Sequence, residues 1–407
     1  MKYTDLNLKP EIVKALKENG IVEATEIQEK TIPLIIENKD VIGMSKTGSG
    51  KTAAFVVPLL QLLEKTSIQT LILSPTRELA VQIANEIEKF GKYVHPKVAT
   101  IYGGVGYGPQ IKAIKTANMV VATPGRLLDL LERGDISFPK LKHFVLDEAD
   151  KMVEMGFIED IERIMKATPE QKQISLFGAT LSSEIDYLKA KHMTNPITIE
   201  AEAYVGDSIL KQYYYDVKQH QKFSLLVHLL KTEDVDRVII FCSTINTVKI
   251  LTDNLRRQGI KAEMMHGKLS QTRRLSVIEN FHKDKIKILV ASSVAARGLD
   301  IKGVTHVFNY DLSKDSQEYI HRIGRTARAG DEGKAITLLS DKDYDTFNQI
   351  LNRYGNVKVE ELKAEGFEKL PFHREEMRPR DRKPFDKKRN SRGTTHSNPS
   401  RRPAWAR

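Results

Sequence analysis

Short runs of β-branched and other apolar residues alternate with amphipathic stretches along most of the chain, and this alternation constrains the fold strongly. Strands are predicted in the first half at Asp40–Gly43, Thr70–Leu73, Val98–Tyr102, Met119–Ala122, His143–Leu146 and Ile174–Phe177. In the second half they are predicted at Arg237–Phe241, Ile288–Ala291, Val304–Asn309 and Ala335–Leu338. Strand–helix alternation is typical of parallel sheets covered by helices on both faces. We therefore expect an α/β fold.

Helical periodicity is clearest in Arg77–Phe90. Its apolar residues Leu79, Ile83, Ile87 and Phe90 recur on one face, and Gly91 is placed to end the helix.

Two domains and a tail are predicted. The polar stretch Ile199–Lys211 lacks periodicity, so we expect α/β domains at 1–203 and 212–365, joined by a linker at 204–211. Residues 366–407 are rich in Arg, Pro, Ser and Asn and nearly devoid of aliphatic side chains. Such a segment buries too little apolar surface to offset its ordering entropy, so disorder is predicted there.

The positive charge is concentrated in the tail. The 407 residues carry a formal charge of +11, and Arg374–Arg407 holds 12 Lys/Arg against 4 Asp/Glu, a net of +8. A basic tail favours polyanions such as nucleic acid through counterion release. It could equally be a solubilising tail, and charge alone leaves both readings open.

Other classes of protein are disfavoured. No run approaches the roughly 18 consecutive apolar residues of a membrane span, and the N-terminus lacks an apolar signal-peptide core. A cytoplasmic protein without membrane contact is expected. The single cysteine, Cys242, excludes an internal disulfide and a metal site built from several cysteines.

The segment Ser45–Thr52 reads SKTGSGKT and lies between a predicted strand and a predicted helix, Thr52–Leu63. Glycines let backbone N–H groups turn toward phosphates at a helix N-terminus. Lys51 would reach the β/γ-phosphates, and the Thr52 hydroxyl would ligate Mg²⁺. The predicted nucleotide-binding residues of this loop are Ser45, Lys46, Thr47, Gly48, Ser49, Gly50, Lys51 and Thr52.

A second motif, Asp147-Glu148-Ala149-Asp150, follows the apolar strand ending at Leu146. A carboxylate at that position would lie at the sheet edge beside the phosphate loop. We expect Asp147 to hold Mg²⁺ and Glu148 to orient and deprotonate the attacking water.

Together these residues resemble the DEAD-box RNA helicases of helicase superfamily two, from Tyr3 to about Leu339. The motifs occur in that family's order, and include Pro75–Ala80, Gly103-Gly104, Thr123–Arg126 and His321–Arg328. The resemblance implies two tandem RecA-like domains that close over ATP and single-stranded RNA.

The resemblance also implies nucleotide contacts outside the phosphate loop. Gln28 matches the glutamine that reads adenine, Tyr3 the isolated upstream aromatic, and Asp300 the residue that meets the ribose. Ile21 stands where an aromatic usually stacks on the base, and Ala24 replaces a usual proline. Weaker adenine stacking is therefore expected.

Arg325 and Arg328 match the family's arginine fingers. They would reach from the second domain to the γ-phosphate and stabilise transition-state charge. The catalytic residues implied are Lys51, Glu148, Arg325 and Arg328.

The RNA contacts implied by the resemblance are hydroxyl, guanidinium and glycine positions, which grip phosphate and sugar without reading bases. They fall on Thr76, Arg77, Gly104, Thr123, Arg126, Arg274 and Ser292.

Two motifs depart from the family pattern. Ser-Ala-Thr is Gly178-Ala179-Thr180 here, which removes a hydroxyl implicated in linking hydrolysis to the domain interface. Thr-Asp is Ser292-Ser293, which removes a carboxylate. Both changes leave the catalytic groups intact, so ATP hydrolysis is expected while its coupling to strand separation is open.

The leading hypothesis is an RNA-dependent ATPase that locally unwinds short duplexes or remodels RNA–protein complexes by ATP-driven domain closure. An alternative is an ATP-gated RNA clamp or annealing chaperone dominated by the tail. A DNA helicase of the same superfamily is a third reading, because composition does not separate RNA from DNA. Ribonucleoprotein and ribosome-assembly partners are compatible with each RNA hypothesis.

Overall fold

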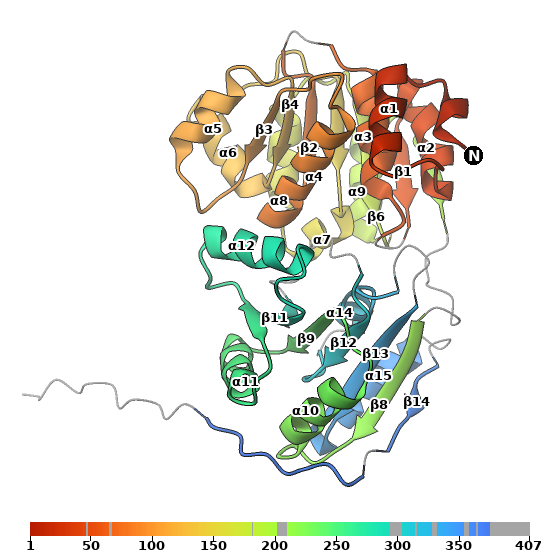
Figure 1. Cartoon of the computed structure of the whole chain (residues 1–407). Coiled ribbons are helices and arrows are strands. Elements are labelled where there is room, and N and C mark those ends of the chain that lie inside the picture. Colours follow the sequence, from red (N-terminus) through yellow and green to blue (C-terminus); the bar gives the residue numbers. More distant parts are fainter. Residues whose placement is uncertain are drawn as a thin grey trace, which may run out of the picture. The chain divides into compact units, whose positions relative to one another are not determined.

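The computed structural model contains two sheets of parallel strands flanked by helices, as the sequence predicts (Figure 1). It describes residues 1–45, 48–64, 67–180, 182–201, 210–293, 303–313, 316–327, 332–353, 358–363 and 365–374. Met1–Phe372 forms one compact unit. Within the described ranges, no helix has the length and apolar character needed to cross a bilayer.

The first sheet has seven parallel strands in the order β3-β4-β2-β5-β6-β1-β7. In chain order the strands are β1 (Val41–Met44), β2 (Thr70–Leu73), β3 (Val98–Ile101), β4 (Met119–Ala122), β5 (His143–Leu146), β6 (Gln173–Gly178) and β7 (Ile197–Glu200). The six predicted strands are confirmed to within a residue or two. Strand β7, which pairs with β1 at the sheet edge, was not predicted.

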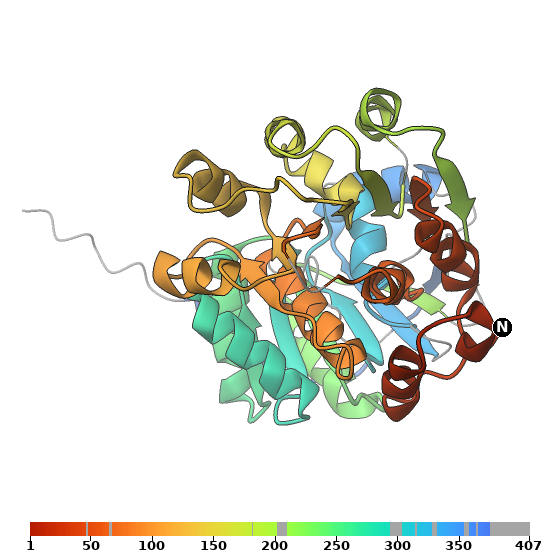
Figure 2. The same cartoon turned by 90° about the horizontal axis from the view of Figure 1, so that it is seen from above.

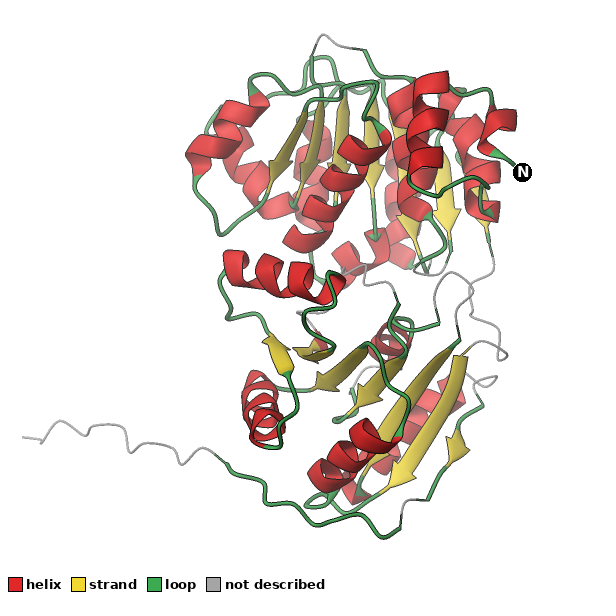
Figure 3. Ribbon diagram, viewed as in Figure 1, coloured by secondary structure: helices red, strands yellow, loops and turns green. Residues whose placement is uncertain are grey.

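Helices cover both faces of this sheet, and Figure 3 shows its strands between them. One face carries α1 (Pro10–Glu18), α2 (Glu26–Ile36), α3 (Lys51–Gln61) and α4 (Arg77–Phe90). The other carries α5 (Tyr107–Ile114), α6 (Pro124–Glu132), α7 (Ala149–Glu154), α8 (Ile158–Lys166) and α9 (Ser183–His192). A 3-10 helix, Tyr3–Leu6, precedes α1.

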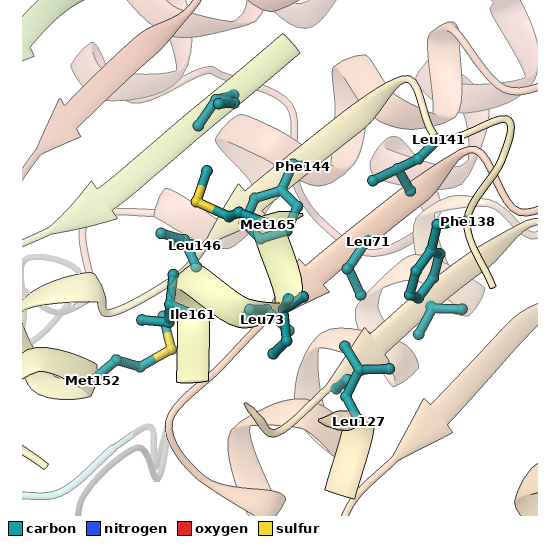
Figure 4. Close-up of a cluster of buried hydrophobic side chains, with 14 of the residues drawn as sticks. Leu71, Leu73, Leu127, Phe138, Leu141, Phe144, Leu146, Met152, Ile161 and Met165 are labelled. Atoms are coloured by element: carbon teal, nitrogen blue, oxygen red, sulfur yellow. The ribbon is translucent and has the colours of Figure 1, made fainter. Parts of the chain in front are cut away.

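Strand side chains alternate between these two layers because successive residues point to opposite faces. Leu71 and Leu73 pack in the α5–α9 layer, whereas Ile72 packs in the α1–α4 layer. Figure 4 shows Leu71, Leu73, Phe144 and Leu146 from the strands meeting Ile161 and other helical side chains. Both faces are buried, so the strands read as continuous apolar runs.

The second sheet also has seven parallel strands, in the order β10-β11-β9-β12-β13-β8-β14. They are β8 (Leu210–Asp216), β9 (Val238–Cys242), β10 (Ala262–Met265), β11 (Ile288–Ser292), β12 (His306–Asn309), β13 (Gly333–Leu339) and β14 (Glu360–Glu361). The four predicted strands are confirmed as β9, β11, β12 and β13. Strands β8, β10 and β14 were missed.

Helices again pack on both faces of the second sheet, as Figure 2 shows from above. One core contains α10 (Lys222–Thr232) and α11 (Ile245–Arg257). The opposite face carries α12 (Gln271–His282), α14 (Ser316–Ile323) and α15 (Tyr344–Arg353). A 3-10 helix, Asp341–Asp343, precedes α15.

The predicted linker and tail are only partly described. Residues 202–209 and 375–407 lie outside the described ranges, while Leu210 and Lys211, predicted as linker, begin β8. Disorder predicted from residue 366 is wrong at its start, because Phe367, Leu370 and Phe372 pack on the α10 core. The centre of the Phe372 ring lies 5.2 Å from that of Phe223. These few apolar residues are therefore enough to anchor the start of the segment.

Candidate nucleotide-binding and nucleic-acid-binding site

The predicted nucleotide residues meet at one edge of the first sheet. Strands β5, β6 and β1 are neighbours, and in a parallel sheet their carboxyl ends share an edge, where ligands bind. The phosphate loop follows β1, Gly178 ends β6, and Asp147–Asp150 follow β5. Residues separated by more than a hundred positions in the chain are thereby brought side by side.

The phosphate loop is tied to this edge by its own side chains. Ser45 Oγ and Ser49 Oγ lie 2.6 Å apart. Lys51 Nζ donates to the Ser45 carbonyl and, at 3.3 Å, to the Gly178 carbonyl. Burial lowers the pKa of Lys51, and the charges of Asp147, Asp150 and Glu148 oppose this shift. Lys46 and Thr47 lie outside the described residues.

Gln28 and Tyr3 pack against the same loop. Gln28 Nε2 donates to the Gly50 carbonyl at 2.9 Å, and the Tyr3 hydroxyl donates to Gln28 Oε1 at 2.6 Å. Thr25 Oγ1 also donates to the Ser49 carbonyl at 2.8 Å. Gly50 has a φ of 89°, and a Cβ there would lie 2.2 Å from Gln28 Nε2. Only glycine fits at that position, so the glutamine and the loop are matched parts of one structure.

Asp147 is almost fully buried beside this loop. Its exposed fraction is 3%, and Oδ1 accepts a hydrogen bond from the Glu148 N–H at 3.0 Å. Burial, together with the charge of Glu148, raises the pKa of Asp147 to about 7. A bound cation would stabilise the ionised form of this buried carboxylate.

Glu148 is held by one carboxylate oxygen and leaves the other without a partner. Lys151 Nζ donates to Oε1 at 2.5 Å, whereas buried Oε2 has no hydrogen-bond partner among the described residues. Burial alone would raise the pKa of Glu148, but the charges of Lys151 and Arg325 lower it to about 2. Glu148 also has a φ of 53°, the kind of strained backbone that occurs at functional sites.

Asp150 joins this motif to the end of β6. Its Oδ2 accepts from the N–H groups of Ala179 at 2.9 Å and Thr180 at 3.1 Å. A Cβ built on Gly178 would lie 3.4 Å from the Asp150 carboxyl group, which is ordinary van der Waals contact. The carboxylate therefore bridges two loops of the nucleotide edge, and the space beside Gly178 would accept a small side chain.

The RNA candidates of the first half lie along the same sheet edge, after β2, β3 and β4. Thr76 caps α4 by accepting from the Leu79 N–H at 3.3 Å, and Thr123 is the N-cap residue of α6. Gly104 has a φ of 83°, and a Cβ there would lie 2.3 Å from Arg77 Nη1. The glycine thus lets the Arg77 guanidinium lie against the backbone.

Arg126 is fixed against the neighbouring loop. Its Nη1 donates to the Val105 carbonyl at 3.1 Å, and Nε lies 3.7 Å from Asp129 Oδ2. The guanidinium carbon is 4.2 Å from the centre of the Tyr107 ring. Candidates Arg77, Gly104 and Arg126 therefore belong to one continuous group of contacts.

In the second half, buried Arg325 donates from Nε to the His321 carbonyl at 3.2 Å. Ser292 ends β11 and is 7% exposed. Arg274 Nε lies 3.0 Å from Glu78 Oε1 of the first half, in the same compact unit. Asp300 and Arg328 lie outside the described residues.

Ser293, which stands where the family pattern has a carboxylate, is hydrogen-bonded to a buried arginine. Buried Arg322 donates from Nε to Ser293 Oγ at 2.9 Å, and its Nη2 lies 2.7 Å from Glu318 Oε1. Glu318 precedes Arg322 by four residues on α14, a spacing that places both on one helix face. Arg322 therefore has an acidic partner in Glu318 although position 293 carries no carboxylate.

Several contributors were missed from the sequence. Lys151 follows Glu148 by three residues at a helix start, and Thr25 precedes Gln28 by three residues in a capping box. Both spacings are visible in the sequence and could have drawn attention to these residues. The Glu78–Arg274 pair has no such local signal.

Comparisons with known proteins agree with this arrangement. The family model "DEAD/DEAH box helicase" matches residues 25–188, and "Helicase conserved C-terminal domain" matches residues 221–330. The chain is 43% identical over 354 residues to the ATP-dependent RNA helicase CshA of Limosilactobacillus reuteri, covering 86% of this chain and 71% of that protein. It is 42% identical over 365 residues to a probable ATP-dependent RNA helicase of Methanocaldococcus jannaschii, covering 89% and 98%.

Solved structures give the same result. S. cerevisiae Dbp5 bound to RNA and ADP BeF3 has a TM-score of 0.81 and 32% identity, covering 89% of this chain and 95% of Dbp5. Mss116p bound to ssRNA and AMP-PNP has a TM-score of 0.80 and 28% identity, covering 89% and 80%.

Proposed function

This chain belongs to the DEAD-box family of ATP-dependent RNA helicases, and we propose that it unwinds short RNA duplexes locally, or remodels RNA–protein complexes, by ATP-driven domain closure. The observation that carries this proposal is the shared sheet edge. Candidate ATP residues follow β1, β6 and β5, and candidate RNA residues follow β2, β4 and β3. The two candidate sites therefore lie next to each other on one edge, because β2 and β5 are neighbouring strands.

The general base of this proposal is Glu148. Lys151 fixes Oε1, so Oε2 is the atom that can accept a hydrogen bond and then a proton from the attacking water. Lys51 would neutralise phosphate charge from the start of α3. Arg325 of the second half would stabilise the γ-phosphate in the transition state, and its charge already acts on Glu148.

The residues present fit a magnesium ion held jointly with nucleotide phosphates. Among the described residues, no cluster of three or more His, Cys, Asp or Glu side chains could hold a metal alone. Mg²⁺ usually binds through one or two carboxylates plus substrate phosphates, which suits Asp147 with the Thr52 hydroxyl. The ion would supply neutralisation of phosphate charge.

RNA would be held by its backbone. Thr76, Arg77, Gly104, Thr123 and Arg126 offer hydroxyl, guanidinium and backbone groups, which contact phosphate and sugar rather than base edges. Arg274 and Ser292 would add contacts from the second half. Binding would then be largely independent of sequence.

The remaining assignments follow the same proposal. We infer RecA-like domains at 1–203 and 212–365 joined by a linker at 204–211, with the basic tail beyond. Gln28 and Tyr3 would bind adenine, and Asp300 and Arg328 would complete the closed ATP site. A cytoplasmic protein with ribonucleoprotein or ribosome-assembly partners is proposed, and RNA crosslinked to the protein in cells and sequenced would identify its targets.

The direct test is the ATPase rate with and without single-stranded RNA at low salt. RNA should stimulate hydrolysis, because bound RNA favours the closed ATP site. A rate that RNA leaves unchanged would contradict the proposal. A matched DNA strand separates the substrates: equal stimulation by deoxyribose and ribose strands would remove the RNA assignment and favour a DNA helicase.

A clamp or annealing chaperone is a second candidate, favoured by Gly178 and the basic tail. Because Phe372 packs on Phe223, the informative truncation is after Arg374 rather than earlier. If annealing is lost while ATPase and unwinding persist, the tail is the chaperone. If unwinding falls too, the tail is a tether that raises the local RNA concentration.

A further inference from the structure

The ring of Tyr107, the first residue of α5, contacts two guanidinium groups. The guanidinium carbons of Arg126 and Arg133 are 4.2 and 4.3 Å from the centre of its ring. Both arginines come from α6 or its C-cap, seven residues apart, which is about two helical turns. The electron-rich face of an aromatic ring attracts cations at this range.

Tyr107 restrains Arg126 in two ways. Its ring contacts the guanidinium directly, and the neighbouring Asp129 carboxylate acts on its hydroxyl and raises the pKa of Tyr107. Asp129 Oδ2 in turn lies 3.7 Å from Arg126 Nε. With the Val105 carbonyl on Nη1, the arginine is held from several sides, and only 10% of its side chain is exposed.

We propose that Tyr107 is a positioning residue for RNA binding, which fixes the Arg126 guanidinium in the conformation that contacts an RNA phosphate. The inference rests on the proposed RNA contact of Arg126. A free arginine side chain loses rotamer freedom when it binds a phosphate, and prior ordering removes part of that cost. Tyr107 itself does not contact the RNA.

The position of Tyr107 extends this effect to a second candidate contact. Tyr107 and Val105 lie just after Gly103-Gly104, and the Arg77 guanidinium packs against these two glycines. The contacts of Tyr107 and Val105 with Arg126 therefore fasten this loop to the first turn of α6. Loss of the Tyr107 ring contact would therefore make both the loop after β3 and the Arg126 side chain more mobile.

The test uses the full chain and measures the concentration of single-stranded RNA that gives half-maximal ATPase. Tyr107→Leu removes the ring and the hydroxyl, and should raise this concentration about two- to fivefold, the worth of an exposed cation–π contact. The maximal rate at saturating RNA should stay within about twofold of wild type, because chemistry is not altered. Tyr107→Phe keeps the ring and should recover most of the affinity.

Salt dependence separates positioning from loss of charge. Arg126→Ala removes a phosphate contact and should reduce the slope of log affinity against log salt by about 1. Tyr107→Leu leaves the arginine charged, so it should weaken binding with the slope unchanged. Asp129→Ala, which releases both partners, should resemble Tyr107→Leu and serves if the leucine variant fails to fold.

Tyr93 provides a matched control. Lys14 Nζ and Lys92 Nζ lie 4.4 and 5.0 Å from its ring centre, and its hydroxyl donates to Glu18 at 2.6 Å. Tyr93→Leu loses the same kinds of contact beyond the C-terminal end of α4, whereas the candidate RNA residues Thr76 and Arg77 lie at its N-terminal end. It should leave the half-saturating RNA concentration at the wild-type value.

The double variant decides between the outcomes. Adding Tyr107→Leu to Arg126→Ala should cause no further loss, because the ring acts through the arginine. A full additional loss would show that Tyr107 acts independently, and would overturn the inference. Wild-type affinity in Tyr107→Leu beside weakened Arg126→Ala would also overturn it. Unchanged affinity in Arg126→Ala would instead refute the RNA contact proposed for that residue.

Discussion

Lys151 Nζ lies 2.5 Å from Glu148 Oε1, and the two side chains form an ion pair that is almost entirely buried. Lys151 is 4% exposed and Glu148 12%. The pair keeps the carboxylate charged within a desolvated site and leaves Oε2 as the acceptor. The proposed general base, which caps α7, is thus oriented by Lys151 in the first turn of the same helix.

Glu148→Gln should abolish ATP turnover while keeping ATP and RNA binding. The amide oxygen can still accept from Lys151, so the local structure persists, but the amide cannot take a proton from water. A loss of at least about 10²-fold in the hydrolysis rate is expected. Steady-state ATPase and fluorescent-nucleotide titration measure the two properties. Near-normal turnover would mean that another group is the base.

Lys151→Met should both slow turnover and destabilise the fold. Methionine preserves much of the volume, but Glu148 becomes a buried charge without its partner, which costs about 3 kcal/mol in a typical buried pair. Denaturant unfolding and ATPase rates report the two effects. Lys30→Met is the matched control, because Lys30 pairs with Glu26 at about half exposure and should lose less than about 1 kcal/mol. Equal losses in both variants would refute a special role for Lys151.

Asp147 should make the stability of the folded state fall as the pH rises, which is opposite to the effect of a carboxylate whose pKa is lowered by folding. Its pKa is raised from 3.8 to about 7, so the folded state holds this proton more tightly than the unfolded state. The resulting stabilisation is complete below pH 3.8 and is lost as the pH rises through about 7. Mg²⁺ binds the ionised carboxylate, so the rise in Tm on adding Mg²⁺ with ADP should be larger at pH 8 than at pH 5.

The control for this effect is Asp147→Asn, measured with EDTA and with Mg²⁺. The amide has no proton to lose in this range, so the Mg²⁺-induced rise in Tm should be small and nearly independent of pH. A wild-type rise that is equal at both pH values would contradict the assignment of Asp147 as a metal ligand.

Local signals explain which elements were predicted well. Helix α4 was predicted at its observed bounds, Arg77–Phe90, because Thr76 caps it, Gly91 ends it and its apolar face is regular. Strand β8 was missed because Leu210–Asp216 includes Lys, Gln and Asp and lacks a run of aliphatic residues. Strand β10 is an edge strand whose central residues are half-buried, so it lacks the continuous apolar run of a central strand.

The residues of the candidate site also divide into those with a local sequence signal and those without one. The phosphate loop and Asp147–Asp150 are contiguous motifs, so the sequence reveals them directly. The contact between Tyr107 and Arg133 depends on how α5 and α6 pack on the sheet, and no spacing encodes it. Gln28 could be named only by resemblance, whereas its fit against Gly50 required the tertiary structure.

Gly178→Ser should fold normally and increase the number of strands separated per ATP hydrolysed. The added Cβ would lie 3.4 Å from the Asp150 carboxyl group, so the hydroxyl can donate to Asp150. One such hydrogen bond would favour the coupled state about threefold. Duplex unwinding and ATPase rates measured on the same sample give the ratio.

A contrasting variant at the same edge is Gly50→Ala, whose Cβ would lie 2.2 Å from Gln28 Nε2. It should weaken ATP binding because the loop and Gln28 must move apart. If Gly178→Ser leaves the ratio of strands separated to ATP hydrolysed unchanged, then the coupling of this helicase is not set at the end of β6.

Arg325→Ala should leave ATP binding intact but lower turnover by about 10³, the worth of an arginine finger. Arg325 is 3% exposed, and its charge already lowers the pKa of Glu148, so its removal takes positive charge from the place where phosphate charge develops. Arg163→Ala removes an exposed arginine paired with Glu132 on the surface and should keep the wild-type rate. Because Arg325→Lys restores a charge without the planar fork, it should recover only part of the activity. A mild effect of Arg325→Ala would show that Arg325 is misassigned as an arginine finger.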